Sequence, residues 1–164
     1  MIVRLLKLII AVVFLAGYKI YIFSQKLRGR KMPPTLVIIT YHPIKTEHKT
    51  KFERQMNTLL KKGKPVSLDG NLNMLKKGTN IAVSFDDAYK SVLQNALPIL
   101  RARKIPATIF VPTGCMGRKP TWITNPNHSY ANETVLTEKQ LKSLPADLIT
   151  IGSHTVSHIN INHA

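Results

Sequence analysis

Hydrophobic residues are arranged differently at the two ends of the chain. Residues 5–23 are apolar apart from Lys7 and Lys19, whereas the later apolar runs are short and separated by polar residues. As a helix, residues 5–23 would rise ~28 Å, close to the hydrocarbon thickness of a bilayer. Both lysines lie near the ends, where their side chains can reach the interface. The pattern predicts a membrane helix that contacts lipid through residues 5–23.

Residues 1–31 form the first expected domain, a membrane anchor with a basic flank. A cleaved signal peptide is the alternative, but no small-x-small cleavage site follows the apolar run. We therefore expect an uncleaved, single-pass anchor in the plasma membrane. More positive residues follow the segment than precede it, and this charge distribution by itself favours a cytoplasmic position for residues 32–164.

Residues 32–164 form the second expected domain, in which strand and helix patterns alternate. Short apolar, β-branched runs predict strands at 35–40, 65–68, 80–85, 107–111 and 148–152. Apolar residues at helical spacing predict helices at 52–62, 72–76 and 89–103, the last kinked at Pro98. A long polar loop follows Val111, and Thr137 begins a short helix whose first residues fit a capping box.

Alternating strands and helices predict an α/β fold with a parallel sheet and right-handed crossovers, either open or closed into a barrel. In such barrels the chemistry lies where strands end and the next loop begins. Four groups of residues stand at those ends: Tyr41–His42, Asp86–Asp87, Thr113–Gly114 and His154. Three of the four contain groups that bind metals or move protons.

The strongest chemical signal combines Asp87 with His154 and His158. Two adjacent carboxylates, Asp86 and Asp87, repel each other unless a positive group lies nearby, although an N-cap role for the following helix would also explain them. The two histidines are four residues apart, so on one helical turn they would share a face. Two histidines and one carboxylate form the three-ligand set of catalytic metal sites.

Net charge limits the classes of partner that the chain can bind, and cysteine content limits its disulfides. The chain carries 24 Lys and Arg against 8 Asp and Glu, a formal net charge of +16. Such a surface attracts nucleic acid, anionic lipid or acidic polymers. No nucleic-acid module and no basic helix interleaved with aromatic residues is present, so we expect no nucleic-acid partner. Cys115 is the single cysteine, which excludes an intramolecular disulfide.

Two segments resemble the signatures of the NodB-type polysaccharide deacetylases, carbohydrate esterase family 4. The first is NIAVSFDDAYKSVLQNALPILRARKIPATIFVPTG at 80–114, and the second is IGSHTVSH at 151–158. The strand that ends in Tyr41–Ile44 is also similar to that of members acting on surface polysaccharides. The resemblance implies a deformed (β/α) barrel outside the plasma membrane. It also implies a divalent metal ion, zinc being the expected one, and removal of N-acetyl or O-acetyl groups from a cell-surface polysaccharide.

The resemblance also implies roles for individual residues. Asp87, His154 and His158 would be the metal ligands, and Asp86 would be the catalytic base that takes a proton from the attacking water. Tyr41 and His42 would bind substrate. Backbone N–H groups after Val111 would help to hold the oxyanion. His48 and His128 are expected to be solvated loop residues.

Three departures from the family pattern change the expectation for activity. Ala88 stands where the family usually has Gly, and Ile159 stands where it often has Pro. The family's later motifs, including the histidine that protonates the leaving amine, have no counterpart up to Ala164. We therefore expect a partial, unclosed barrel that a longer product or a second chain completes, with weak turnover by residues 1–164 alone.

Two other functions remain open at this point. One is a catalytically inactive, membrane-tethered remnant that binds metal or glycan. The other is a cytoplasm-facing membrane protein that binds anionic lipid or polymer through its basic surface.

Overall fold

The computed structural model describes residues 2–30, 33–70 and 75–159. The chain divides into two compact units, Met1–Pro34 and Thr35–Ala164. The predicted domain boundary after residue 31 falls close to this division.

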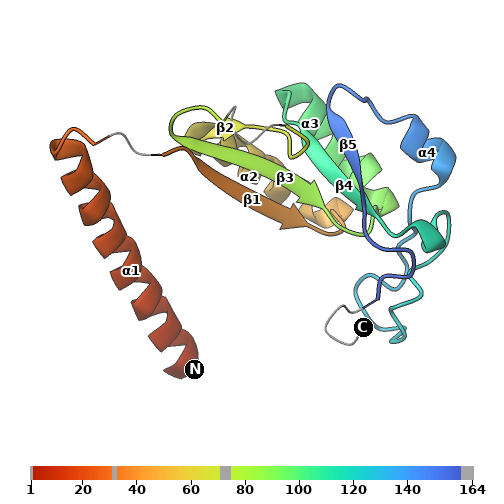
Figure 1. Ribbon diagram of the computed structural model, residues 1–164. Coiled ribbons are helices and arrows are strands. Elements are labelled where there is room, and N and C mark those ends of the chain that lie inside the picture. Colours follow the sequence, from red (N-terminus) through yellow and green to blue (C-terminus); the bar gives the residue numbers. More distant parts are fainter. Residues whose placement is uncertain (1, 31–32, 71–74, 160–164) are drawn as a thin grey trace. The chain divides into compact units, whose positions relative to one another are not determined.

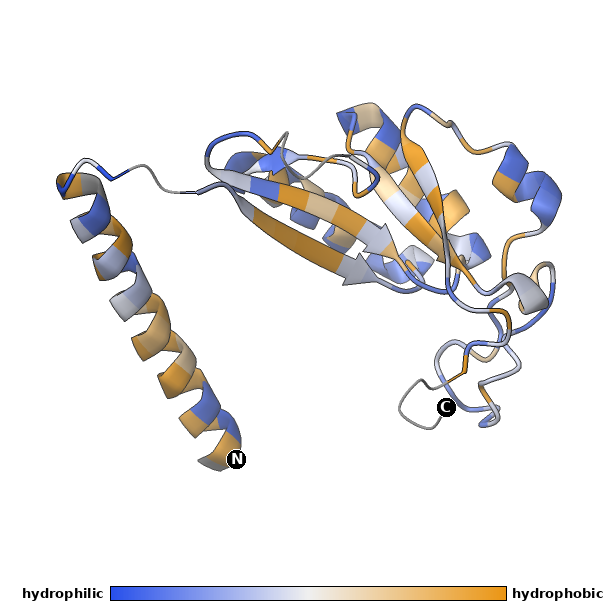
Figure 2. Cartoon of the chain, viewed as in Figure 1, coloured by the Kyte–Doolittle hydropathy of each residue, from blue (hydrophilic) through white to orange (hydrophobic). Residues whose placement is uncertain are grey.

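The first unit contains one long helix, α1 (Ile2–Leu27) (Figure 1). Its segment Val3–Gln25 is long and apolar enough to cross a membrane. Figure 2 shows that apolar residues occupy most of its length, with polar residues concentrated toward the ends. A signal sequence has the same properties, so the choice of an uncleaved anchor stays a prediction.

The second unit contains a parallel sheet. Its strands are β1 (Thr35–Tyr41), β3 (Thr79–Phe85), β4 (Ala107–Val111) and β5 (Ile149–Ser153), in that spatial order. The short strand β2 (Lys64–Pro65) pairs in parallel with the beginning of β3. Within the described residues the sheet is open, as predicted for a partial barrel. Its completion by a second chain stays a prediction.

The helices share one hydrophobic core with β3, β4 and β5. They are α2 (Lys49–Lys62), α3 (Leu97–Arg103) and the short α4 (Glu138–Lys142) (Figure 1). Their buried side chains join those of the sheet in one core, which includes Phe52, Met56, Leu59, Val83, Phe85, Leu100, Ile109, Leu141 and Ile149. Arg103 ties α3 to α2: its Nη2 lies 2.6 Å from Glu53 Oε1, and its Nε donates to Asn57 Oδ1 at 2.7 Å.

Two predicted elements differ from the structure. The strand expected at 65–68 ends at Pro65, because Ser67 and Asp69 turn toward β5, where both contact the Thr150 hydroxyl. The helix expected at 89–103 contains a π-helical turn, Val92–Ala96, directly before α3, and the kink expected at Pro98 stays a prediction. Proline has no N–H to donate within the helix and clashes with the carbonyl four residues earlier, and a widened turn accommodates both effects.

The remaining helix predictions have mixed outcomes. The capping box at Thr137 is confirmed, since the Thr137 side chain accepts from the Gln140 N–H and the Gln140 side chain accepts from the Thr137 N–H. Most of the helix predicted at 72–76 lies outside the described residues. The end predicted at residue 62 for the helix 52–62 is confirmed. Gly63 is extended, with φ −166, and a Cβ there would lie 2.7 Å from the Thr79 carbonyl oxygen.

Candidate metal centre

Asp87 lies on a strained turn after the central strand β3. The Asp86 N–H donates to the Tyr41 carbonyl at 2.8 Å, so the turn begins at a fixed distance from β1. Asp87 and Ala88 then have positive φ angles of 69° and 50°, a left-handed conformation that costs ~1–2 kcal/mol for each L residue. No side-chain cap from either aspartate to a backbone N–H occurs within the described ranges, so the N-cap explanation gains no support.

His154 and His158 lie on a loop that follows β5. The helical turn expected for them is wrong, because the segment is irregular and Thr155 and His158 have positive φ angles of 62° and 55°. The loop starts from the sheet, where the His154 N–H donates to the Val111 carbonyl at 2.9 Å. A tight loop therefore brings the two rings together without helical spacing.

The loop after β4 holds the histidine loop through its backbone. The Thr113 N–H donates to the Thr155 carbonyl at 3.2 Å, and the Gly114 N–H donates to the Val156 carbonyl at 2.7 Å. These two amides are already paired, so the oxyanion role expected for backbone N–H groups after Val111 stays a prediction that rests on the other amides of the loop. A Cβ at Gly114 would lie 2.5 Å from the Val156 carbonyl oxygen, so only glycine permits this close approach.

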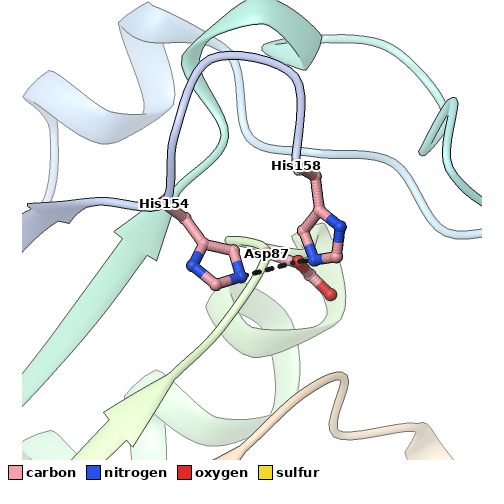
Figure 3. Close-up of side chains that lie close together, drawn as sticks. All are labelled: Asp87, His154 and His158. Carbon is pink, nitrogen blue, oxygen red and sulfur yellow. Dashed lines mark ion pairs between the residues drawn. The ribbon is translucent and has the colours of Figure 1, made fainter. Parts of the chain in front are cut away.

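The three predicted ligands converge on one point (Figure 3). The Nε2 atoms of His154 and His158 lie 3.5 and 3.1 Å from Asp87 Oδ1, and one ligand atom of each residue lies within 4.8 Å of the others. The Asp87 side chain is 3% exposed, and its Oδ1 has no hydrogen-bond partner in the described part of the chain. Ligand atoms ~2.0–2.2 Å from a tetrahedral ion lie ~3.3–3.5 Å apart. The residues present therefore fit a divalent metal ion.

Aromatic side chains pack against both imidazoles. Trp122 stacks on His158, with ring centroids 4.1 Å apart and an interplanar angle of 12°. The ring centroids of Phe110 and His154 lie 6.5 Å apart. The sequence contains a single tryptophan in a polar loop, but its pattern does not show that this loop reaches His158.

Tyr89 adds a second buried polar group beside the carboxylate. Its side chain is fully buried, and its hydroxyl has no hydrogen-bond partner among the described residues. Burial and the nearby negative charge of Asp87 raise the pKa of the Tyr89 phenol. The phenol therefore stays protonated next to the candidate ligand.

A cavity of about 400 Å³ opens at this cluster. Most residues of its wall are either candidate metal ligands or carry an aromatic or imidazole ring. They are His42, Asp87, Tyr89, Trp122, His128, Tyr130 and His158. The rings of His42 and Tyr130 are stacked, with their centroids 6.3 Å apart. His128 Nδ1 accepts the Tyr130 N–H at 3.2 Å. His128 is exposed, as expected for a loop residue, but it lies on the wall of the cavity.

Two other predicted site residues are placed differently. The ring of Tyr41 packs 5.1 Å from Phe52 and 5.7 Å from Phe85, and its hydroxyl donates to Gln55 Oε1 at 3.2 Å. Tyr41 thus faces α2, and the structure does not bring it to the ligand cluster. Asp86 is partly exposed next to Asp87. The roles predicted for Tyr41 and Asp86 stay predictions.

Comparison with known proteins identifies the family. The family model described as polysaccharide deacetylase matches residues 75–164, a range that contains Asp87, His154 and His158. The chain belongs to the polysaccharide deacetylase family. The resemblance deduced from the two sequence signatures is confirmed.

Two relatives show the extent of the similarity. YxkH of Bacillus subtilis (strain 168), whose name assigns it to the polysaccharide deacetylases, is 30% identical over 141 residues, which cover 79% of this chain and 46% of YxkH. The poly-beta-1,6-N-acetyl-D-glucosamine N-deacetylase of Staphylococcus aureus is 31% identical over 100 residues, which cover 58% of this chain and 31% of that enzyme. The chain thus spans about half of the first relative and a third of the second.

Solved structures of deacetylases have the same fold. IcaB from Ammonifex degensii superimposes with a TM-score of 0.61 at 26% identity, over 76% of this chain and 56% of IcaB. A polysaccharide deacetylase from Bacillus cereus gives a TM-score of 0.57 at 21% identity, over 79% of this chain and 42% of that protein. The predicted α/β fold of the NodB type is therefore confirmed, with an open sheet that corresponds to part of the barrel.

Proposed function

We propose that this chain contributes the metal-binding part of a hydrolase that removes acetyl groups from an N-acetylated or O-acetylated cell-surface polysaccharide. The convergence of Asp87, His154 and His158 in a member of this family is the observation that carries the proposal. The name of the staphylococcal relative supports an N-acetylglucosamine polymer as the substrate.

The proposed chemistry assigns a separate task to each side chain. Asp87, His154 and His158 would hold a divalent ion, for which zinc suits the two nitrogen ligands and one oxygen ligand. Bound there, the ion would polarise the acetyl carbonyl and lower the pKa of the attacking water. Asp86, next to Asp87 and partly exposed, would take the proton of the attacking water. A carboxylate near a cation stays ionised and suits that role.

His42 is the proposed proton donor to the departing amine. From the sequence, we expected this histidine to come from a later family motif, but His42 lines the same cavity as Asp87 and His158. Its exposed ring can exchange protons with solvent. Positioned general acids contribute ~10²–10⁴-fold to rate, so His42 would offset part of the weak turnover expected of this chain.

We also propose that α1 stays on the protein as a single-pass anchor, with the deacetylase domain outside the plasma membrane. Its apolar length supports the anchor, and a surface polysaccharide as substrate supports the orientation. Membranes extracted with carbonate should retain the chain with an intact N-terminus. Protease added to intact cells should remove the domain. Release of a shortened soluble chain would contradict the anchor, and full protease protection would contradict the orientation.

Release of free amine from a β-1,6-linked N-acetylglucosamine pentamer tests the activity. The chain with added zinc should release amine, and a chelator should stop the release. Asp86→Asn and His42→Ala should each lower the rate ~10²-fold or more while zinc binding persists. Amine release that continues unchanged in Asp86→Asn would contradict the mechanism. Zinc and pentamer binding without amine release would instead favour the inactive, glycan-binding alternative.

A further inference from the structure

A buried hydroxyl on the wall of the cavity at the candidate ligands has no role in the chemistry proposed above. It belongs to Tyr89, whose side chain is fully buried and lines the cavity together with Asp87. Neither the Tyr89 hydroxyl nor Asp87 Oδ1 has a hydrogen-bond partner among the described residues. Burial of a polar group without a partner costs free energy, and native folds rarely leave such groups unpaired. A donor and an acceptor thus lie unpaired on the wall of one cavity.

Backbone contacts hold Tyr89 in place. The carbonyl of the residue before it and the N–H of the residue after it are hydrogen-bonded to the segment 134–136, at 2.9 and 2.8 Å. Tyr89 itself pairs with Val135 in an isolated antiparallel bridge. Its ring centroid lies 6.0 Å from that of Tyr130. Because these contacts fix both the backbone and the ring, the hydroxyl stays inside the protein.

The Asp87 carboxylate is the acceptor that the Tyr89 hydroxyl can reach. Asp87 lies two residues earlier on the strained turn, and its negative charge acts on the Tyr89 phenol together with burial. Asp87 Oδ1 faces the imidazole Nε2 atoms of His154 and His158, at 3.5 and 3.1 Å. An ion held by these three atoms leaves the second carboxylate oxygen free to accept a hydrogen bond. Carboxylates that bind metals are commonly oriented by such an outer hydrogen bond.

We propose that Tyr89 is a positioning residue for the metal site, whose hydroxyl donates a hydrogen bond to the Asp87 carboxylate oxygen that the ion leaves free. This hydrogen bond keeps Oδ1 turned toward the imidazoles, and it gives the buried hydroxyl a partner in the metal-bound protein. The inference rests on the proposed function, because Asp87, His154 and His158 must hold a divalent ion. A tyrosine that serves only to fill the core would act through its ring and not through its hydroxyl.

Tyr89→Phe in the full chain separates the hydroxyl from the ring. Because the variant removes a buried hydroxyl that has no partner, the denaturant midpoint of the metal-free chain should stay the same or rise. Zinc affinity, measured by competition with a chromophoric chelator, should fall ~10–100-fold. A role in packing alone would lower the midpoint and leave zinc affinity unchanged. Zinc affinity within twofold of the parent chain overturns the proposal.

Thr108→Val is the matched control. Thr108 is also buried, and its hydroxyl has no hydrogen-bond partner in the described part of the chain. It lies within β4, however, and does not line the cavity. Zinc affinity of this variant should stay within twofold of the parent chain. A tenfold loss would mean that removal of any buried hydroxyl disturbs the metal site, and it would overturn the specific role of Tyr89.

Cobalt(II) in place of zinc gives a spectroscopic test of the ligand geometry. Its visible absorption depends on how the ligands are arranged around the ion. At saturating cobalt, Tyr89→Phe should change the spectrum, because the Asp87 carboxylate loses its fixed orientation. Thr108→Val should keep the spectrum of the parent chain. A Tyr89→Phe spectrum identical to that of the parent chain overturns the positioning role.

Zinc binding by the parent chain separates failure of this inference from failure of the proposed function. If the parent chain binds zinc but releases no amine, the proposed activity is wrong, and the zinc affinity of Tyr89→Phe still decides the positioning role. If the parent chain is active and Tyr89→Phe binds zinc equally well, only the positioning role is wrong. If the parent chain binds no zinc, the metal site and the positioning role are overturned together.

Discussion

The two parts of the candidate metal centre are held by different parts of the fold. Asp87 follows the central strand β3, and its side chain is 3% exposed. His154 and His158 follow β5, at the edge of the described sheet, and their side chains are 31% and 30% exposed. One ligand thus belongs to the interior and the other two to a surface loop.

The supporting contacts differ in the same way. Next to Asp87, Ala88 and Tyr89 are fully buried, and the Ala88 carbonyl accepts the Leu136 N–H at 2.9 Å. The histidine loop is held instead by two backbone hydrogen bonds from Thr113 and Gly114 and by the Trp122 ring. We infer that folding of the core sets the carboxylate, whereas loop contacts set the imidazoles. Changes to the loop contacts should therefore reduce metal affinity without unfolding the protein.

The largest expected effect comes from the ligands. His154→Ala and Asp87→Asn should each weaken zinc binding more than 100-fold, since loss of a ligand exceeds the ~10–100-fold loss typical of supporting residues. Their effects on the free energy of unfolding of the metal-free chain should differ in size. Asp87→Asn removes a buried charge whose Oδ1 has no hydrogen-bond partner among the described residues and should raise the free energy of unfolding by ~1 kcal/mol.

Zinc titration and denaturant unfolding of the metal-free chain measure the two quantities separately. His154→Ala, at a half-exposed position, should change the free energy of unfolding by less than ~0.5 kcal/mol. Zinc binding that survives His154→Ala unchanged would show that the site is wrong.

The second-largest effect on zinc affinity is expected from the backbone contact between the loop after β4 and the histidine loop after β5. Gly114→Ala places a Cβ 2.5 Å from the Val156 carbonyl oxygen, so the histidine loop must shift. Zinc affinity should fall ~10–100-fold. Gly70→Ala is the matched control, because the nearest atom to its added Cβ is 3.7 Å away. Equal zinc affinities for the two variants would show that the close contact between Gly114 and Val156 does not hold the histidine loop in place.

Removal of the ring that stacks on His158 should have a smaller effect. Trp122→Ala should weaken zinc binding ~10-fold, because the imidazole gains rotational freedom. Trp122→Phe keeps an aromatic ring at the position from which Trp122 stacks on His158 and should retain most of the affinity. If the alanine and phenylalanine variants bind zinc equally, stacking does not orient His158.

The smallest effect is expected for a contact far from both loops. Arg103→Ala removes the hydrogen bonds to Glu53 and Asn57 that join α2 and α3. Because Glu53 is 45% exposed, solvent screens the ion pair, and the free energy of unfolding should fall by only ~1 kcal/mol. Zinc affinity should not change. A coupled loss of zinc affinity would show that the core and the loops are not independent.

The sequence predicted the elements that depend on local pattern. The apolar run of α1, the β-branched strands and the capping box at Thr137 each depend on neighbours within a few residues, and each is present. The parallel direction of the strands followed from the alternation of elements, because parallel strands need crossover connections. Recognition of Asp87, His154 and His158 as a set rested on the rule that strand ends meet at one edge of the sheet, on the four-residue spacing of the histidines, and on the resemblance to the deacetylase signatures.

Contacts between distant loops could not be read from local pattern. Tyr41 and His42 are adjacent in sequence, yet the Tyr41 hydroxyl donates to Gln55 on α2, whereas His42, the first residue after β1, lines the cavity beside Asp87. The histidines approach each other through positive φ angles at Thr155 and His158, not through helical spacing.

The tertiary structure alone decided how the histidine loop is held. Gly114 and Trp122 carry no periodic signal, and their importance arises from close approach to residues more than thirty positions later. The pattern of apolar and polar residues indicates which residues are buried. Steric fit between the loops, however, depends on where the folded sheet positions each loop. For this protein, the sequence determined the candidate ligands, and packing of the loops after β4 and β5 determined their geometry.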